Sequence, residues 1–356
     1  MTDSWTFAVA RADLARTMLV AGKAPTLSEG EALLRVDRVG LTANNVTYAV
    51  LGDAMRYWQF FPPEAGGLGR EWGLPPLWGF AEVVESAVPG VEAGQRVYGY
   101  LPPAGHLVVR PDRVEATGFR DVSPHRVDLP SPYNSYRSTA GDPAYRPDRE
   151  DQLVLFRPLF FTSFMLADQV ADNNHYGAEA VVLSSASSKT AYSTAFELRG
   201  GGPRLIGLTS PGNLEFTRSL GCYDQVLPYA EIGALDRVPT AYIDVSGAPA
   251  NRAALRDRLG DRLVRDIAVG LTHQVANADQ ADEFFFAPTR MRKRGEDWGR
   301  EGLDRRFAEA WQRFAVVLDK WLDVQVGSGP GALQRAWLEV YSGSTPPRVG
   351  QVIQFG

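Results

Sequence analysis

The second half of the chain alternates short apolar segments with amphipathic ones, and this alternation limits the fold more than any other feature. From about Gln152 the periodicity predicts a helix as far as Asn173. After it, strands are predicted at Ala180–Leu183, Arg204–Thr209, Gln225–Leu227, Tyr242–Val245 and Ile267–Leu271. Helices are predicted between them at Lys189–Leu198, Asn213–Leu220 and Arg252–Leu259. Strand–helix alternation at this spacing is typical of a parallel sheet with helices on both faces.

The first 130 residues have a different pattern, rich in short β-type segments. Strands are predicted at Ala32–Val39, Ala81–Val88, Arg96–Tyr100 and His106–Arg110, separated by Pro and Gly pairs. Many short strands at close spacing favour a small barrel or sandwich. Ser131–Glu150 has no periodicity and is interpreted as a connecting loop. With 356 residues, the chain is long enough for two domains.

The C-terminal quarter is predicted to contain one further strand at Glu283–Ala287 and a long amphipathic helix at Leu303–Val326. A helix, a Gly/Pro turn and a closing strand at Val349–Phe355 follow. A basic run lies between the strand and the long helix, and we interpret it as a solvated loop, with a phosphate or acyl-CoA site as the alternative. The run consists of Arg290, Arg292, Lys293 and Arg294.

Charge and cysteine content exclude several classes of function. The chain has 37 Lys and Arg against 42 Asp and Glu, a net charge of −5, without a basic stripe. A protein that binds duplex nucleic acid needs clustered cations. No nucleic-acid partner is therefore expected. The single cysteine, Cys222, allows no intrachain disulfide, and the four histidines lack the spacing of a zinc site.

No membrane partner is expected either. Charged residues interrupt the N-terminal segment, so it does not resemble an export signal. The most apolar stretch, Leu153–Ala167, is interrupted by Arg157 and Pro158 and is judged too short to span a bilayer. A cytoplasmic protein is therefore expected.

The segment Val181–Phe196, VVLSSASSKTAYSTAF, points most directly to a ligand. An apolar strand leads into a turn of small residues, and the turn opens a helix. Small residues let the backbone approach a pyrophosphate, and the N–H groups of the helix N-terminus face it. The usual glycines are replaced by hydroxyl residues, including Ser184. The predicted cofactor-binding residues here are Ser187, Ser188, Lys189 and Thr190; the alternative is an ordinary Ser-capped helix.

The end of the second predicted strand favours NADP(H) over NAD(H). A site for NAD usually carries Asp or Glu there for the ribose hydroxyls, whereas this chain has Gly207-Leu208-Thr209-Ser210. A 2′-phosphate would therefore meet no carboxylate. Lys189, Asn213 or Arg218 is expected to help hold it, and Thr209, Ser210 and Asn213 are predicted as cofactor-binding residues. Alternatively, Thr209 and Ser210 merely begin a turn before Pro211-Gly212.

A phosphotransferase loop is a third interpretation, because Ser188-Lys189-Thr190 follows a strand. A P-loop needs glycines to wrap its backbone around the phosphates, and Ser184–Ser188 contains none. This interpretation ranks below the dinucleotide site.

The whole chain resembles the medium-chain dehydrogenase/reductase superfamily, especially its zinc-free quinone and enoyl reductases. The phrases LTANNVTYAVLGDAMRYWQFFP, PLWGFAEVVES, SSASSKTAYSTAF, LTSPGN and SLGCYDQVL more specifically resemble a bacterial family of unknown function within or beside it. The resemblance implies an α/β fold: a Rossmann-like parallel sheet domain plus a β-rich GroES-like domain. It implies a GroES-like catalytic domain at 1–150, to which 327–356 returns, and a nucleotide-binding domain at 151–326.

The resemblance also implies that no zinc is bound. In zinc-dependent relatives the stretch Val39-Gly40-Leu41-Thr42 would hold a metal-binding cysteine, and here Thr42 stands in its place. The Gly-His-Glu ligand segment has no counterpart around Leu77-Trp78-Gly79-Phe80, and the four-cysteine structural lobe is absent.

Candidate catalytic residues follow from the same resemblance. Asn44, Asn45 and Tyr48 follow the strand that enters the active-site region of zinc-free relatives, and Tyr57 comes shortly after Gly52. A phenol can hydrogen-bond an oxyanion and donate a proton. We therefore predict Tyr48, Asn45 and Tyr57 as catalytic residues. The alternative is that each is a buried polar residue in a turn.

Further cofactor contacts are implied at the ends of later strands. Gly270 and Thr272 occupy the segment that relatives place against the nicotinamide amide, and Ser246 ends a strand near one of the riboses. In open α/β sheets, ligands collect at the carboxyl ends of strands. His273 is interpreted as structural.

The function that these implications favour is an NADP(H)-dependent, zinc-independent oxidoreductase. It would reduce a small-molecule carbonyl or conjugated enone, enoyl or quinone substrate by hydride transfer. The alternative is a non-catalytic nucleotide-sensing or partner-binding protein on the same fold, since the glycines and an identifiable acid–base pair are missing. A homodimer is compatible with either.

Overall fold

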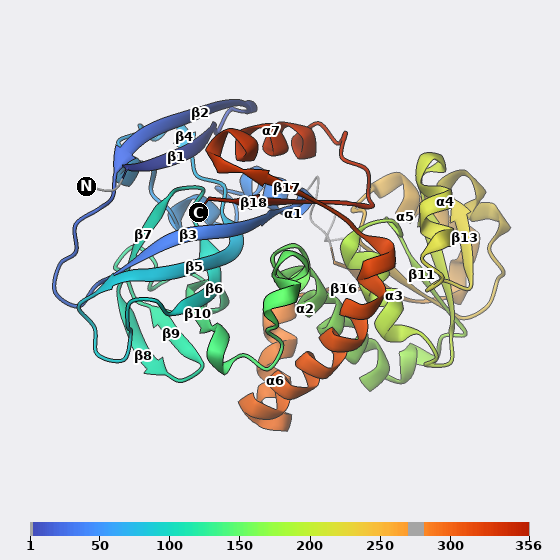
Figure 1. Ribbon diagram of the computed structural model, residues 1–356. Coiled ribbons are helices and arrows are strands. Elements are labelled where there is room, and N and C mark those ends of the chain that lie inside the picture. Colours follow the sequence, from blue (N-terminus) through green and yellow to red (C-terminus); the bar gives the residue numbers. More distant parts are fainter. Residues whose placement is uncertain (1–2, 270–280, 356) are drawn as a thin grey trace. The chain divides into compact units, whose positions relative to one another are not determined.

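The computed structural model describes residues 3–269 and 281–355, and the chain divides into two compact units (Figure 1). Unit 1 comprises Met1–Leu155 and Leu322–Gly356, and unit 2 comprises Phe156–Trp321. The chain passes into unit 2 within helix α2 (Glu150–Asp172) and leaves it at the end of helix α6 (Ala287–Trp321).

Unit 2 is built on a parallel six-stranded sheet with the order β13-β12-β11-β14-β15-β16. The strands are β11 (Ala180–Leu183), β12 (Arg204–Thr209), β13 (Gln225–Pro228), β14 (Thr240–Asp244), β15 (Leu263–Ala268) and β16 (Glu283–Phe284). Numbered from β11, this is the 3-2-1-4-5-6 order of a dinucleotide-binding sheet. The order reverses between β11 and β14, which makes that junction the place where such sheets bind ligands.

Helices connect the strands from β11 to β15, as the alternation predicted. The α-helices are α3 (Lys189–Leu198), α4 (Leu214–Ser219) and α5 (Pro249–Leu259), and the 3₁₀ helices are η6 (Asn174–Gly177), η7 (Pro211–Asn213), η8 (Tyr229–Ala234) and η9 (Gly260–Arg262). Val182, Leu208 and Tyr242 of three neighbouring strands pack with Leu255 and Leu259 of α5 in one buried cluster. Strands buried on both faces explain the nearly continuous apolar runs in the sequence.

Unit 1 contains a nine-stranded sheet and a three-stranded sheet of order β2-β1-β4. The larger sheet follows β17-β18-β3-β5-β6-β10-β9-β8, and β7 also pairs with β3. The strands are β1 (Asp3–Ala10), β2 (Asp13–Lys23), β3 (Ala32–Leu41), β4 (Trp72–Gly73), β5 (Leu77–Ser86), β6 (Arg96–Leu101), β7 (His106–Val109), β8 (Pro111–Glu115), β9 (Gly118–Asp121), β10 (Ser135–Ser138), β17 (Asp323–Ser328) and β18 (Val349–Gln354).

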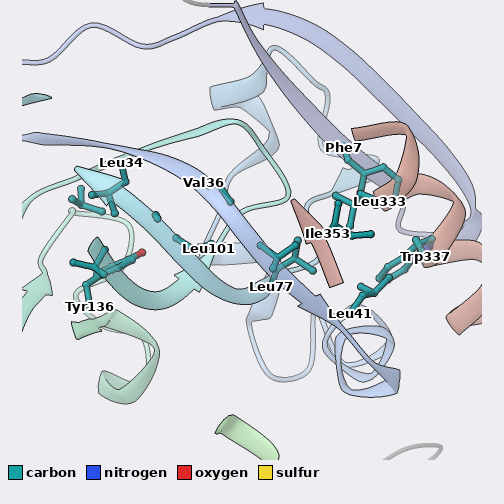
Figure 2. Close-up of a cluster of buried hydrophobic side chains, with 14 of the residues drawn as sticks. Phe7, Leu34, Val36, Leu41, Leu77, Leu101, Tyr136, Leu333, Trp337 and Ile353 are labelled. Carbon is teal, nitrogen blue, oxygen red and sulfur yellow. The ribbon is translucent and has the colours of Figure 1, made fainter. Parts of the chain in front are cut away.

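Helices α1 (Ala43–Val50) and α7 (Gly329–Tyr341) complete unit 1, together with 3₁₀ helices. These are η1 (Tyr57–Gln59), η2 (Pro63–Gly66), η3 (Ser131–Asn134), η4 (Thr139–Gly141) and η5 (Pro147–Arg149). Figure 2 shows the core: Phe7 of β1 and Ile353 of β18 lie beside Leu333 and Trp337 of α7. The Trp337 indole N–H donates to the Leu14 carbonyl oxygen at 2.8 Å. The N- and C-terminal segments therefore share one core.

Two sequence-based assignments of secondary structure differ from the structure. The helix predicted at Leu303–Val326 begins at Ala287 and ends at Trp321, and it is followed by strand β17. A break at Gly299, with φ +70°, interrupts the helical periodicity and hid the first part of the helix. The loop predicted at Ser131–Glu150 contains strand β10, which is held by pairing with β6 and β9.

The basic run is not a solvated loop, since it lies in helix α6. Arg290 and Arg294 are only 6% and 10% exposed, and both form ion pairs with Asp168 and Asp172 of α2 at 2.5–2.9 Å. Their spacing of four residues places both guanidinium groups on one face of the helix. The ion pairs of Arg290 and Arg294 therefore join helix α6 to helix α2.

The apolar helix that includes Leu153–Ala167 is longer than expected. The described stretch Pro147–Asp172 continues through Pro158 and, by length and composition alone, could cross a membrane, with a mean hydropathy of 1.3. Within the structure, 61% of the window that passes this test is buried. A core helix passes the same test, so the finding is weak evidence for a membrane span.

Candidate functional site

The small-residue turn lies at the reversal point of the unit 2 sheet. Ser184–Ser188 connects β11 to α3, and Ser185 adopts a left-handed conformation with φ +49°. Helix α3 begins where expected because the Ser188 hydroxyl accepts a hydrogen bond from the Ala191 backbone N–H at 3.3 Å. The structure therefore contains the Ser N-cap that the sequence suggested for this helix. This cap leaves the N–H groups of the first helical turn facing the end of the sheet, where an anion could bind.

Contacts from neighbouring elements hold this turn in place. The Ser185 backbone N–H donates to the Tyr229 hydroxyl at 2.8 Å, and the Tyr223 hydroxyl donates to the Ala186 carbonyl at 3.0 Å. The Ala186 N–H donates to the Leu208 carbonyl at 2.9 Å. A Cβ at Gly207 would lie 2.8 Å from the Ala186 Cβ, so this glycine allows β12 to approach the turn.

Ser187 brings together the two segments predicted to bind the nucleotide. Its hydroxyl oxygen accepts hydrogen bonds from Thr209 Oγ1 at 3.3 Å and from Asn213 Nδ2 at 3.1 Å. Because the oxygen accepts both, the Ser187 proton can be donated to a further oxygen. Ser210 is exposed at the start of η7. The structure thus places Ser187, Thr209 and Asn213 together.

Lys189 and Thr190 lie in the first turn of α3. The Lys189 ammonium lies 5.9 Å from the centroid of the Phe156 ring, and burial lowers its pKa to about 8. A protonated Lys189 near this ring adds a cation–π attraction. The Thr190 carbonyl accepts hydrogen bonds from Ser163 of α2 and from Thr194, both at 2.9 Å. Gly270 and Thr272, predicted to contact the nicotinamide, and His273 lie outside the described residues.

Replacing Ser185 by glycine should stabilise unit 2. A left-handed conformation costs a non-glycine residue about 1–2 kcal/mol, and replacement by glycine removes this strain. Part of the gain is lost because glycine has greater conformational freedom in the unfolded chain. We expect the free energy of unfolding to rise by up to about 1 kcal/mol in Ser185→Gly and to fall in Ser185→Val. Urea unfolding followed by circular dichroism measures both changes. Equal stability of the two variants would contradict the expectation.

Unit 1 carries an aromatic cluster that contains two of the predicted catalytic tyrosines. Tyr48 of α1 and Tyr57 of η1 have ring centroids 4.7 Å apart, and Tyr133 of η3 lies 5.8 Å from Tyr57. Trp78 and Tyr100 pack against them, with centroids 4.9 Å apart. The cluster gathers four phenols from four separate segments of the chain, since Tyr100 lies on β6.

The hydroxyls of this cluster are kept in their neutral form. The Trp78 indole N–H donates to the Tyr48 hydroxyl at 3.0 Å, and the Tyr57 and Tyr133 hydroxyls share a hydrogen bond of 3.3 Å. Burial raises the pKa of Tyr48, Tyr57 and Tyr133 above the usual phenol value. A phenol that stays protonated is a hydrogen-bond donor to an oxyanion at all moderate pH values.

Asn45 occupies a structural position. Its side-chain oxygen accepts hydrogen bonds from the Thr42 backbone N–H at 2.8 Å and from the Thr42 hydroxyl at 3.3 Å. Its amide nitrogen donates to the Pro76 carbonyl at 2.9 Å. These contacts form a capping box at the start of α1 and fix the helix that carries Tyr48. A direct catalytic role for Asn45 stays a prediction.

Tyr133 was missed by sequence analysis. It lies in a segment interpreted as a loop, and its only sequence signal is the richness of that segment in Pro and Tyr. The Arg126 guanidinium donates to the Tyr133 carbonyl at 2.6 Å and so fixes its backbone. Only the fold brings this phenol to Tyr57.

The donor chemistry does not suggest a metal centre. Within residues 3–269 and 281–355, no group of three or more His, Cys, Asp or Glu side chains could hold a metal ion. Thr42, which the resemblance aligns with a metal-binding cysteine of zinc-dependent enzymes, is the N-cap of α1.

The fold and the turn together define a class. A sheet in 3-2-1-4-5-6 order, with a strand–small-residue-turn–helix at its reversal point, is typical of the Rossmann-like fold class, and here a separate β-rich unit accompanies it. The chain belongs to the family DUF2855, described as a protein of unknown function, whose profile matches residues 39–346. The predicted resemblance is thereby confirmed.

Several solved structures share this fold. CurA from Vibrio vulnificus in complex with NADPH has a TM-score of 0.64 at 12% identity, with 99% of each chain covered. A quinone oxidoreductase from Coxiella burnetii has a TM-score of 0.56 at 13% identity, also with 99% of each chain covered. The yhdH oxidoreductase from Salmonella enterica in complex with NADP has a TM-score of 0.54 at 12% identity, with 99% of this chain and 100% of the other covered. No curated protein matches. The predicted fold class, a Rossmann-like parallel sheet domain plus a β-rich GroES-like domain, is confirmed.

Proposed function

We propose that the chain is an NADP(H)-dependent oxidoreductase that reduces a small carbonyl, enone, enoyl or quinone compound without zinc. The observation that carries the proposal is the hydroxyl-lined turn at the reversal point of the sheet, where Ser187 is joined to Thr209 and Asn213. Neither 184–190 nor 209–213 contains a carboxylate. These two segments therefore fit a phosphorylated dinucleotide, whose phosphates need hydrogen-bond donors and no carboxylate among the residues that contact them. CurA and yhdH bind such dinucleotides on the same fold.

In this proposal the residues of unit 2 hold the cofactor. The hydroxyls of Ser187, Ser188 and Thr190 and the ammonium of Lys189 serve the pyrophosphate, and Thr209, Ser210 and Asn213 serve the 2′-phosphate. By the resemblance, Ser246, Gly270 and Thr272 contact the ribose and the nicotinamide. When bound, NADPH supplies the hydride.

The phenols of unit 1 would act on the substrate oxygen. Tyr57 carries a neutral hydroxyl next to the hydroxyl of Tyr133. A pair of phenols can stabilise an oxyanion by two hydrogen bonds and then return a proton to it. Tyr48 supports Tyr57 through ring packing, and Asn45 fixes the helix that carries Tyr48.

Cofactor preference tests the proposal directly. A phosphorylated dinucleotide should bind more tightly because no carboxylate opposes its 2′-phosphate. NADPH should therefore raise the melting temperature more than equimolar NADH, as expected for a ligand that binds only the folded state. Differential scanning fluorimetry at several concentrations of each measures the shifts. Negligible shifts with both would overturn the proposal.

A non-catalytic nucleotide-binding protein is the second candidate. The Asn45 amide is engaged on both sides, and the Tyr48 hydroxyl already accepts from Trp78. These contacts leave few side chains for acid–base work. NADPH binding without oxidation across quinones, enals, enones and enoyl thioesters would favour it. In either form the proposal expects a cytoplasmic protein, as a monomer or a homodimer.

A further inference from the structure

We propose that Ser184 and Asp244 are positioning residues that hold the glycine-free turn in its cofactor-binding conformation. Ser184 directly follows β11, and Asp244 ends β14, so the pair spans the junction where the strand order reverses. Sequence analysis named Ser184 only as one of the hydroxyl residues that replace the glycines of the turn, and it did not name Asp244. The inference rests on the proposed function and adds residues that act on the nucleotide indirectly.

The hydrogen bonds converge on one carboxylate oxygen. Asp244 Oδ1 accepts from the Ser184 hydroxyl at 2.7 Å, from the Ser246 hydroxyl at 2.8 Å and from the Gly247 N–H at 3.0 Å. The Ser184 oxygen in turn accepts from the Val245 and Ser246 N–H groups, both at 2.9 Å. The ends of β11 and β14 are thereby bound together through side chains.

An arginine compensates the buried charge. Asp244 is 1% exposed, and its second oxygen, Oδ2, pairs with Arg252 of α5 at 2.9 Å; Arg252 itself is 4% exposed. Arg252 also lies 3.4 Å from Asp266, which is paired with Arg256 at 2.8 Å. A buried carboxylate needs such a partner. The pairing leaves Oδ1 free to serve the turn.

Glycine usually allows the backbone of such a turn to adopt its conformation. Here side-chain hydrogen bonds hold the turn in that conformation instead. Glycine enters the left-handed region without steric cost, whereas Ser185 holds φ +49° against it. Ser184 is the residue before Ser185, so its hydrogen bond to Asp244 fixes the position of the backbone that leads into the strained residue. Losing that bond would let the turn relax, and the Ser187 hydroxyl and the first N–H groups of α3 would lose their common direction. Misplaced donors cost binding even when every donor is still present.

Two variants test the inference, and a third serves as a matched control. Ser184→Ala removes the hydroxyl, and Asp244→Ala removes the acceptor. Ser193→Ala removes another fully buried hydroxyl, one on α3 that has no hydrogen-bond partner in the described structure. The dissociation constant of NADPH is measured by the change in its fluorescence, well below the melting temperature of each variant. We expect it to rise roughly tenfold or more in Ser184→Ala and Asp244→Ala, and to stay within about twofold in Ser193→Ala.

Asp244→Asn keeps the inference testable if Asp244→Ala does not fold. The amide oxygen of this variant can still accept the hydrogen bonds of the turn, although the charge pair with Arg252 is lost. Its NADPH affinity should therefore stay much closer to the wild type than that of Ser184→Ala. A merely structural role would lower the melting temperatures without changing the dissociation constants, and that result would overturn the inference. Absence of NADPH binding in the wild-type protein would overturn the proposed function and the inference together. Tight binding by the wild type and unchanged binding by the variants would overturn the inference alone.

Discussion

Replacing Arg126 by methionine should lower the free energy of unfolding of unit 1 by about 3–5 kcal/mol. The Arg126 side chain is fully buried and pairs with Asp121 at 3.0 Å. It also donates to the Asn134 side-chain oxygen at 3.0 Å and to the Tyr136 hydroxyl at 2.9 Å. Methionine fills a similar volume but leaves the buried Asp121 carboxylate and these acceptors without the guanidinium donor. A buried acceptor without its donor lowers the free energy of unfolding, because it has lost its contacts with water without gaining a partner.

Urea unfolding of unit 1 measures this loss, and Arg70→Met is its control. Arg70 is 90% exposed and pairs with Glu64 at 3.0 Å, so its replacement should change stability by less than about 1 kcal/mol. Adding Asp121→Asn to Arg126→Met should recover part of the loss, because it removes the uncompensated buried charge. Equal stability of Arg126→Met and Arg70→Met would refute the expectation.

Replacing Tyr57 by phenylalanine should reduce kcat/KM for a conjugated enone by about 100-fold or more, the usual contribution of a positioned proton donor. The substitution removes the hydroxyl that pairs with Tyr133 and leaves the ring packing of the cluster in place. Tyr100→Phe is the matched control, because the Tyr100 hydroxyl is buried without a hydrogen-bond partner in the described structure. Steady-state kinetics should show its activity within a few-fold of the wild type. A similar loss in both variants would assign the effect to packing.

The pH dependence of the same reaction gives an independent check. Burial raises the pKa of Tyr57 above its ordinary value near 10, so the neutral donor persists over a wider range of pH. Activity that depends on this proton is present below the raised pKa and is lost only above it. We therefore expect no loss attributable to Tyr57 below about pH 10. A decline centred below pH 9 that disappears in Tyr57→Phe would contradict this.

Much of unit 2 could be predicted because its signals are local. Helix α3 was predicted with both its bounds, Lys189 and Leu198, since a Ser cap and an apolar strand precede it. The parallel sheet followed from apolar runs of the length of one strand. The polar strand β17 could not be recognised, because it is defined by its pairing with β18 rather than by its own pattern.

The residues of the candidate sites also separate into those with a local sequence signal and those without one. The hydroxyl turn was visible because its residues are consecutive. Tyr133 and Asp244 were not, because each acquires its role only through partners far along the chain, Tyr57 and Ser184. Buried charges are hidden for a related reason: in sequence, Arg126 or Arg294 resembles any solvated arginine, and only its partners reveal the burial.

Strand β18 closes the edge of β3 by pairing Val352 with Gly40, residues separated by 352 − 40 = 312 positions. On the ribosome, β3 can pair early with β5 and, at Ala32–Arg35, with β7, but its Arg38–Leu41 portion must wait for β18, which is made only after the whole of unit 2. At the usual rates of synthesis, of order 5–20 residues per second, the wait lasts roughly 15–60 s. An unpaired strand edge is a template for association with other chains. Biosynthesis of this protein therefore includes an interval in which the residues of unit 2 have all been synthesised while part of one strand edge in unit 1 is still unpaired and open to association.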